Sequence, residues 1–144
     1  TSPSLSTDAG IRNTVQTIAL SGASGIGTTA VTSRGLTVIT STGTGAGWTL
    51  NLAAAGRAGV EKTITINPKS TVPVKVRTAS SSQAFYGSTA NAFEASTAGT
   101  TGAVIGKVKT VRLISTTTKE WAIVSVYPVS TTGSTFVTLT GATA

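Results

Sequence analysis

The chain has 144 residues and a formal net charge of +7, and charged residues make up only 10% of it. That length is enough for one domain with a hydrophobic core and too short for two comfortable ones. The sequence contains neither Cys nor His, which excludes disulfides, cysteine nucleophiles and imidazole acid–base catalysis.

The carboxylates are too few and too scattered to build a reactive centre. Only four occur in the chain: Asp8, Glu61, Glu94 and Glu120. Glycoside hydrolysis needs two that face each other across a bond, and metal sites need clustered ligands. Glu61 and Glu120 each lie next to a lysine in the sequence, which is typical of surface ion pairs. We therefore predict no enzymatic activity, no metal site and no cofactor.

The eleven Lys and Arg residues are spread along the chain without a run of five or six. Such a distribution favours solubility and attraction to an acidic partner. Aromatic residues do not alternate with the basic ones, so nucleic-acid binding is not expected. No apolar run approaches the roughly 20 residues of a membrane helix, so no membrane partner is expected either.

The N-terminal half reads as a polar arm followed by short strands. Residues 1–13 are polar around isolated apolar positions, which predicts an extended arm that becomes ordered on a partner. Residues 14–20 and 36–40 are rich in β-branched side chains. Trp48, Leu50 and Leu52 then alternate with polar residues, which predicts a further strand.

Residues 60–80 form the clearest predicted hairpin. Ile64 and Ile66 share one face of the first strand, and the turn residues 67–70 read Asn-Pro-Lys-Ser. On the return strand the valines at 72, 74 and 76 share a face, and Lys75 and Arg77 point the other way. Pro73 favours an edge position or the start of that strand.

Residues 79–103 are small and polar and predict a long loop, with one short helical turn near 92–95. A loop of this length often carries function. Its aromatic residues are Phe85, Tyr86 and Phe93.

A second hairpin is predicted over residues 104–130. Val111 and Leu113 share a face of its first strand. On its second strand the alternation places Trp121, Ile123 and Ser125 on one face and Ala122, Val124 and Val126 on the other. Apolar residues on both faces predict a strand buried on both sides or covered by a neighbouring subunit. We assign Trp121 to the core.

These elements, with a last strand within 133–144, total about seven or eight short strands joined by glycine-rich turns. The predicted fold is all-β: a single antiparallel β-sandwich or barrel-like domain at residues 14–144, preceded by an extended N-terminal arm at 1–13. With so few bulky side chains, burial between subunits would add stability, which favours a homo-oligomer.

The stretch SGASGIG at 21–27 invites comparison with a dinucleotide-binding turn. Its glycines are spaced one residue short of the short-chain dehydrogenase pattern, and TTAVTSRGLTVIT follows it in place of a helix. The next acidic residue is Glu61, too distant to hold a ribose. We interpret the stretch as a turn or surface loop between two strands.

The segment KTVRLISTTTKEWAIVSVYP at 109–128 resembles the terminal hairpin common in virion proteins of tailed phages. EKTITINPKSTVPVKV at 61–76 looks like the preceding hairpin of the same proteins. Together with the N-terminal arm, residues 60–128 make the chain similar to head decoration (capsid cement) proteins.

The resemblance implies a β-rich homotrimer on the capsid exterior of a virion, where it binds the major capsid protein and clamps neighbouring capsomers against internal DNA pressure. It also implies an arm that becomes ordered on the capsid, with Arg12 facing acidic capsid residues. The arm residues that would make contact are Ser2, Pro3, Leu5, Ile11 and Arg12.

A second hypothesis is a receptor- or carbohydrate-binding β-module of a phage fibre or surface adhesin. Sugar platforms are built from exposed aromatic rings, and Phe85, Tyr86 and Phe93 are the candidates for this ligand loop.

Overall fold

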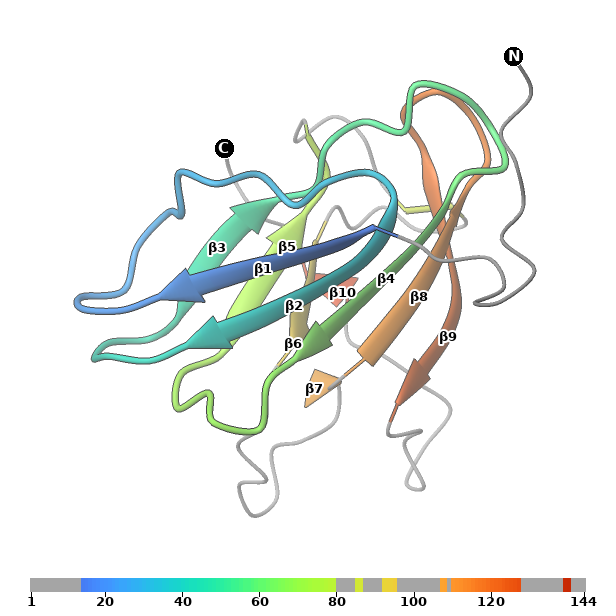
Figure 1. The fold of residues 1–144 in the computed structure, drawn as a ribbon. Helices are drawn as coiled ribbons and strands as arrows, with labels where there is room; N and C mark the ends of the chain where they lie inside the picture. Colours follow the sequence, from blue (N-terminus) through green and yellow to red (C-terminus); the bar gives the residue numbers. More distant parts are fainter. Residues whose placement is uncertain are drawn as a thin grey trace.

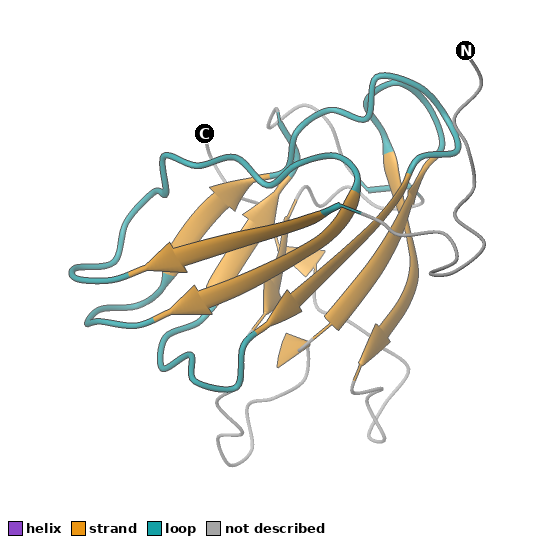
Figure 2. Cartoon of the chain, viewed as in Figure 1, coloured by secondary structure: helices purple, strands orange, loops and turns teal. Residues whose placement is uncertain are grey.

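The computed structural model describes residues 14–79, 85–86, 92–95, 107–108, 110–127 and 139–140. Every regular element in these ranges is a strand, as the all-β prediction requires (Figure 2). No helix in them could cross a membrane. The strands are β1 (Val15–Leu20), β2 (Gly35–Ser41), β3 (Trp48–Asn51), β4 (Glu61–Ile66), β5 (Val74–Arg77), β6 (Ala92–Ala95), β7 (Lys107–Val108), β8 (Thr110–Ser115), β9 (Trp121–Tyr127) and β10 (Leu139–Thr140).

The strands form two sheets that lie in two layers (Figure 1). The main sheet has the order β1-β2-β4-β8-β9, and the second sheet has the order β10-β6-β5-β3, with β7 paired to β6. The sheets do not close into a barrel, so the sandwich alternative of the predicted fold is the one observed.

The prediction of an antiparallel sandwich is wrong for the first half of the chain. β1, β2 and β4 run parallel in the main sheet, and β3 runs parallel to β5 in the second. Residues 23–31 also run parallel to residues 44–52, which include β3, through three isolated bridges. The chain therefore winds through three turns of a coil, and each turn places one segment in each sheet. Connections such as residues 21–34 are long enough for the crossover that parallel strands need.

The predicted hairpin at 60–80 is also wrong, because β4 and β5 belong to different sheets. The predicted turn at 67–70 is nevertheless observed. Ser70 N donates to Asn67 O at 2.9 Å, and Lys69 N donates to Asn67 Oδ1 at 2.9 Å. Thr71 N then bonds to Ser41 O at the end of β2. The turn passes the chain from one layer to the other and does not fold it back on the same sheet.

The predicted hairpin of the second half is confirmed, since β8 and β9 pair antiparallel. The register shifts between Arg112 and Leu113, which leaves Val124 as an extra residue on β9. This bulge corrects the predicted alternation: Val126 is buried with Trp121, whereas Ser125 is exposed. β9 is not buried on both faces, because Val124 is 56% exposed.

The helical turn predicted near 92–95 is replaced by the strand β6, which pairs antiparallel with β5. Alanine and glutamate favour helix, and pairing with the hydrogen-bonding edge of β5 overrides this local preference.

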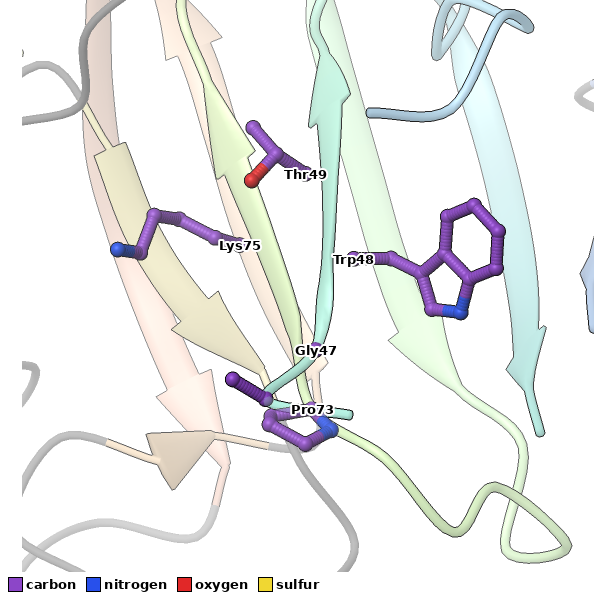
Figure 3. Close-up of a pocket in the computed structure, with 6 residues that line it drawn as sticks. Gly47, Trp48, Thr49, Pro73 and Lys75 are labelled. Carbon is purple, nitrogen blue, oxygen red and sulfur yellow. The ribbon is translucent and has the colours of Figure 1, made fainter. Parts of the chain in front are cut away.

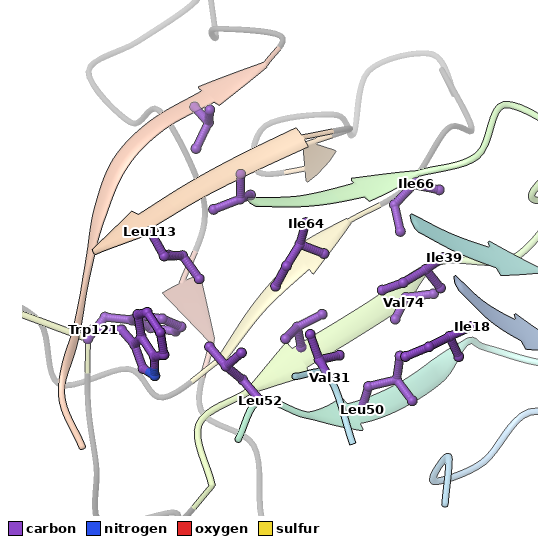
Figure 4. Packing of buried hydrophobic residues seen from close by; sticks show 14 of the residues in the cluster. Ile18, Val31, Ile39, Leu50, Leu52, Ile64, Ile66, Val74, Leu113 and Trp121 are labelled. Carbon is purple, nitrogen blue, oxygen red and sulfur yellow. The ribbon is translucent and has the colours of Figure 1, made fainter. Parts of the chain in front are cut away.

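One hydrophobic core fills the space between the sheets (Figure 4). Ile18, Ile39 and Ile64 come from the main sheet, and Leu50 and Val74 face them from the second. Trp121, which is 1% exposed, closes the core at the β9 end, as predicted. The alternation of buried and exposed positions along β2, β4 and β8 matches the period of a strand with one face on the core.

Candidate functional site

Lys62 and Arg77 are the buried charged side chains of the described residues, and the ammonium group of Lys62 is the one that lies between the sheets. Lys62 is 1% exposed and lies on the inner face of β4. Its Nζ donates to Thr32 Oγ1 at 3.1 Å, to the carbonyl of Arg34 at 3.0 Å and to Thr37 Oγ1. These acceptors are neutral oxygens, so desolvation dominates and lowers the pKa of Lys62 from 10.5 to about 8.

Gln16 completes this cluster from β1. Its Oε1 accepts hydrogen bonds from Thr37 Oγ1 and from Thr32 N, each at 2.9 Å. Its Nε2 donates to the carbonyl of Ala30 at 2.9 Å. The cluster thus ties β1, β2 and β4 to residues 30–34. An amine that is enclosed and already donates three hydrogen bonds is unavailable to a substrate, so we assign the cluster a structural role.

A small hollow of about 150 Å³ opens on the second sheet, lined by Ala46, Gly47, Trp48, Thr49, Pro73 and Lys75 (Figure 3). Trp48 lies on the opposite side of the strands from Thr49 and Lys75 in this view. Its buried Nε1 has no hydrogen-bond partner among the described residues. The volume is below the roughly 300 Å³ of typical ligand pockets, so this hollow is not a candidate small-molecule site. Within the described ranges, no group of His, Cys, Asp and Glu could hold a metal ion.

The outer face of the main sheet is broad and carries few charges. Strand alternation and register place on it Val15, Thr17, Ala19, Leu36, Val38, Thr40, Glu61, Thr63, Thr65, Thr110, Arg112, Ile114, Ala122, Ser125 and Tyr127. We call this set the outer face; only Glu61 and Arg112 in it are charged. Val15 is 63% and Tyr127 65% exposed, so large apolar groups lie at both ends of it.

The glycine-rich stretch at 21–27 is a hydrogen-bonded loop that connects the two sheets. The prediction was a turn or surface loop between two strands. It follows β1 and runs beside the second glycine-rich loop, residues 42–47. Ser24 N donates to Thr44 O, and Ser24 Oγ bonds to Thr44 O and Gly47 N. Gly43 has a φ of 121°, and a Cβ there would lie 2.0 Å from the carbonyl oxygen of Gly22. The glycines permit close backbone contact between two successive turns of the coil.

The predicted capsid-contact arm and the predicted aromatic ligand loop have different outcomes in the structure. The arm, with Ser2, Pro3, Leu5, Ile11 and Arg12, lies outside the described residues. Phe85 is 1% exposed and belongs to the core, so its ring is not part of an exposed platform. Tyr86 is 66% exposed, and its N–H donates to the carbonyl of Trp121. The side chain of Phe93 lies outside the described residues, although its backbone is part of β6.

Sequence reasoning missed the outer face and the edge of β1 that no described strand covers. The signal was present in part, because residues 13–33 contain no charged residue. The sequence did not predict that the threonines and valines of β1, β2 and β4 lie on one surface, because the predicted hairpin pairing would have separated these strands.

The fold defines a class: an all-β protein whose described strands form two sheets. No protein-family model, no curated protein and no solved structure matches this chain.

Proposed function

We propose that the protein is a structural component of a virion that binds the outer surface of the capsid and stabilises the capsid lattice. The observation that carries this proposal is the outer face of the main sheet. A flat sheet surface with threonine hydroxyls, aliphatic groups and few charges suits static contact with another protein. The rigid core beneath it would keep the face ordered before binding, which reduces the entropic cost of association.

The major capsid protein is the partner that the sequence resemblance suggests, and the basic net charge of +7 would favour an acidic surface on it. The arm at residues 1–13 enters the described structure at Thr14, immediately before β1. An arm that binds the capsid would therefore extend from one border of the outer face. Two linked contacts bind more tightly together than either does alone.

The test is co-sedimentation with capsids assembled from any major capsid protein that the same genome encodes. Val38 is half-buried on the outer face, at the centre of β2, one strand in from the β1 edge. Val38→Lys should weaken saturable binding at least about tenfold, because a charge would be placed within the contact. Ala54→Lys adds the same charge at an exposed loop position and serves as the matched control.

Deletion of residues 1–12 should also abolish capsid attachment and leave the fold intact, as circular dichroism would show. Truncated protein that still decorates capsids contradicts the role of the arm. Equal binding by Val38→Lys and the control would contradict the role of the outer face, and absence of saturable binding by the wild type would contradict the proposed function itself.

A receptor- or carbohydrate-binding module is the second candidate, and the exposure of Tyr86 is the observation that favours it. An exposed tyrosine ring can stack on a sugar, but Phe85 beside it is buried and cannot extend the platform. If Tyr86→Ala abolished binding to a glycan array or to cells, this second function would be supported over the first.

A further inference from the structure

β1 is the terminal strand of the main sheet in the described part of the chain, and its backbone leaves one side open. Leu36 N donates to Thr14 O, and Thr42 N donates to Leu20 O. The even-numbered residues of β1 therefore direct their N–H and C=O groups toward β2. Because these groups alternate along a strand, those of Val15, Thr17 and Ala19 point away from the sheet.

The two edges of the main sheet differ in how they resist pairing with another strand. Proteins protect edges with charges, prolines or bulges. β9 contains a bulge at Val124 and directly follows Lys119 and Glu120. β1 is regular over six residues, and residues 14–33 contain neither a charge nor a proline. Of the two described edges of the main sheet, the β1 edge is therefore the one that lacks these protective features.

We propose that β1 pairs antiparallel with β1 of a second copy of this chain, across a twofold axis that passes Thr17. In such a ladder, the residues whose N–H and C=O groups point away from β2 must lie opposite one another. The register places Thr17 opposite Thr17 and Val15 opposite Ala19 of the partner. Two main sheets then continue as one sheet, with the two outer faces on the same side.

The side chains fit this register. The 63% exposed Val15 would pack on the small Ala19, and two threonines would meet at the axis. On the inner face, Ile18 and Leu20 would continue the core toward the partner. In the second sheet, residues 23–31 lie at the same end of the coil, and Ile26 there is 60% exposed.

The self-complementary register favours a second copy as the occupant of this edge, and local charge does not oppose it. Each copy carries +7, so two copies repel each other wherever their cations face. The uncharged stretch 14–33 allows backbone pairing without opposing cations. This inference is independent of the capsid contact, and it replaces the threefold arrangement implied by the sequence resemblance with a twofold one.

The experiment measures self-association of the full chain by sedimentation velocity at several concentrations. Thr17→Pro removes an N–H that points away from the sheet, so the fold should tolerate it. Dimer dissociation should become at least about 30-fold easier, because both copies lose a donor at the axis. Thr17→Val retains the N–H and should leave the dimer intact.

A second pair of variants guards against misfolding. Thr17→Lys places two ammonium groups face to face at the axis and should weaken the dimer at least about tenfold. Thr63→Lys adds the same charge to the outer face on β4, away from the axis, and should not weaken the dimer. Hydrogen exchange gives an independent readout: protection of the Val15, Thr17 and Ala19 amides should rise with protein concentration.

Three outcomes would overturn the proposal. The first is a wild-type monomer at about 100 μM, well above the Kd expected of a functional dimer. The second is a trimer, or a dimer unaffected by Thr17→Pro and Thr17→Lys. The third is concentration-independent protection of the three outward amides, which would mean that another segment of the same chain covers the edge.

Discussion

Nζ of Lys62 donates a hydrogen bond to the hydroxyl of Thr37, and that hydroxyl in turn donates to Oε1 of Gln16. The three side chains come from three adjacent parallel strands and lie at one end of the core. A charge at this position costs desolvation that its neutral partners offset only in part.

We expect the stability of the protein to rise between pH 8 and 10.5, the interval between the folded and unfolded pKa of Lys62. In this window the unfolded chain still binds the proton and the folded chain releases it, so stability increases with pH. The full effect is about 3 kcal/mol. Urea denaturation at a series of pH values measures it.

Lys62→Met is the control for this effect. It retains an unbranched apolar side chain and removes the titrating group, so the rise in stability over that window should disappear. A slope that persists in the variant would assign the pH dependence to other groups. At pH 7 the variant should be within about 1–2 kcal/mol of the wild type, because lost hydrogen bonds and relieved desolvation oppose each other.

Gly43→Ala should destabilise the protein strongly. The added Cβ would lie 2.0 Å from the carbonyl oxygen of Gly22, in a backbone conformation with a φ of 121°. We expect a loss of about 3 kcal/mol or more, measured by thermal or urea unfolding. Gly56→Ala is the matched control, since its φ is 81° and a Cβ there meets nothing within 4 Å. It should cost about 1 kcal/mol.

The two faces of β2 should respond differently to truncation. Ile39 is fully buried in the core, whereas its neighbour Val38 is half-buried on the outer face. Ile39→Ala should cost about 3–4 kcal/mol, and Val38→Ala about 1 kcal/mol. Equal losses would contradict the placement of Val38 on the outer face.

Ser41 connects the two layers, and its loss should be measurable. Its buried hydroxyl donates to the carbonyl of Val72, and its N–H donates to Ser70 Oγ at 3.0 Å. Ser41→Ala would leave that carbonyl without its buried donor, at a cost of about 1–3 kcal/mol. Ser125→Ala, at an exposed position of β9, should change stability by less than about 0.5 kcal/mol. Chemical denaturation of both variants makes the comparison.

Local patterns predicted which residues are buried more accurately than how the strands pair. Ile64, Ile66, Val74 and Val76 are all buried as the alternation along 60–80 predicted. The same segment was nevertheless assigned to a hairpin, because Asn-Pro-Lys-Ser can either return a strand to its own sheet or pass it to the opposite layer. That choice depends on which edge of β4 is free, and β2 and β8 occupy its two edges.

The outer face depends on strand pairing even more directly. Thr17, Val38 and Thr65 lie far apart in the sequence and meet in one row of the outer face only because β1, β2 and β4 are parallel neighbours. The chain by itself determined the all-β class and the burial of Trp121, since these follow from composition and from the two-residue period of strands. The tertiary structure decided the parallel coil, the buried Lys62 and the open edge of β1, because each depends on hydrogen bonds between residues distant in the sequence.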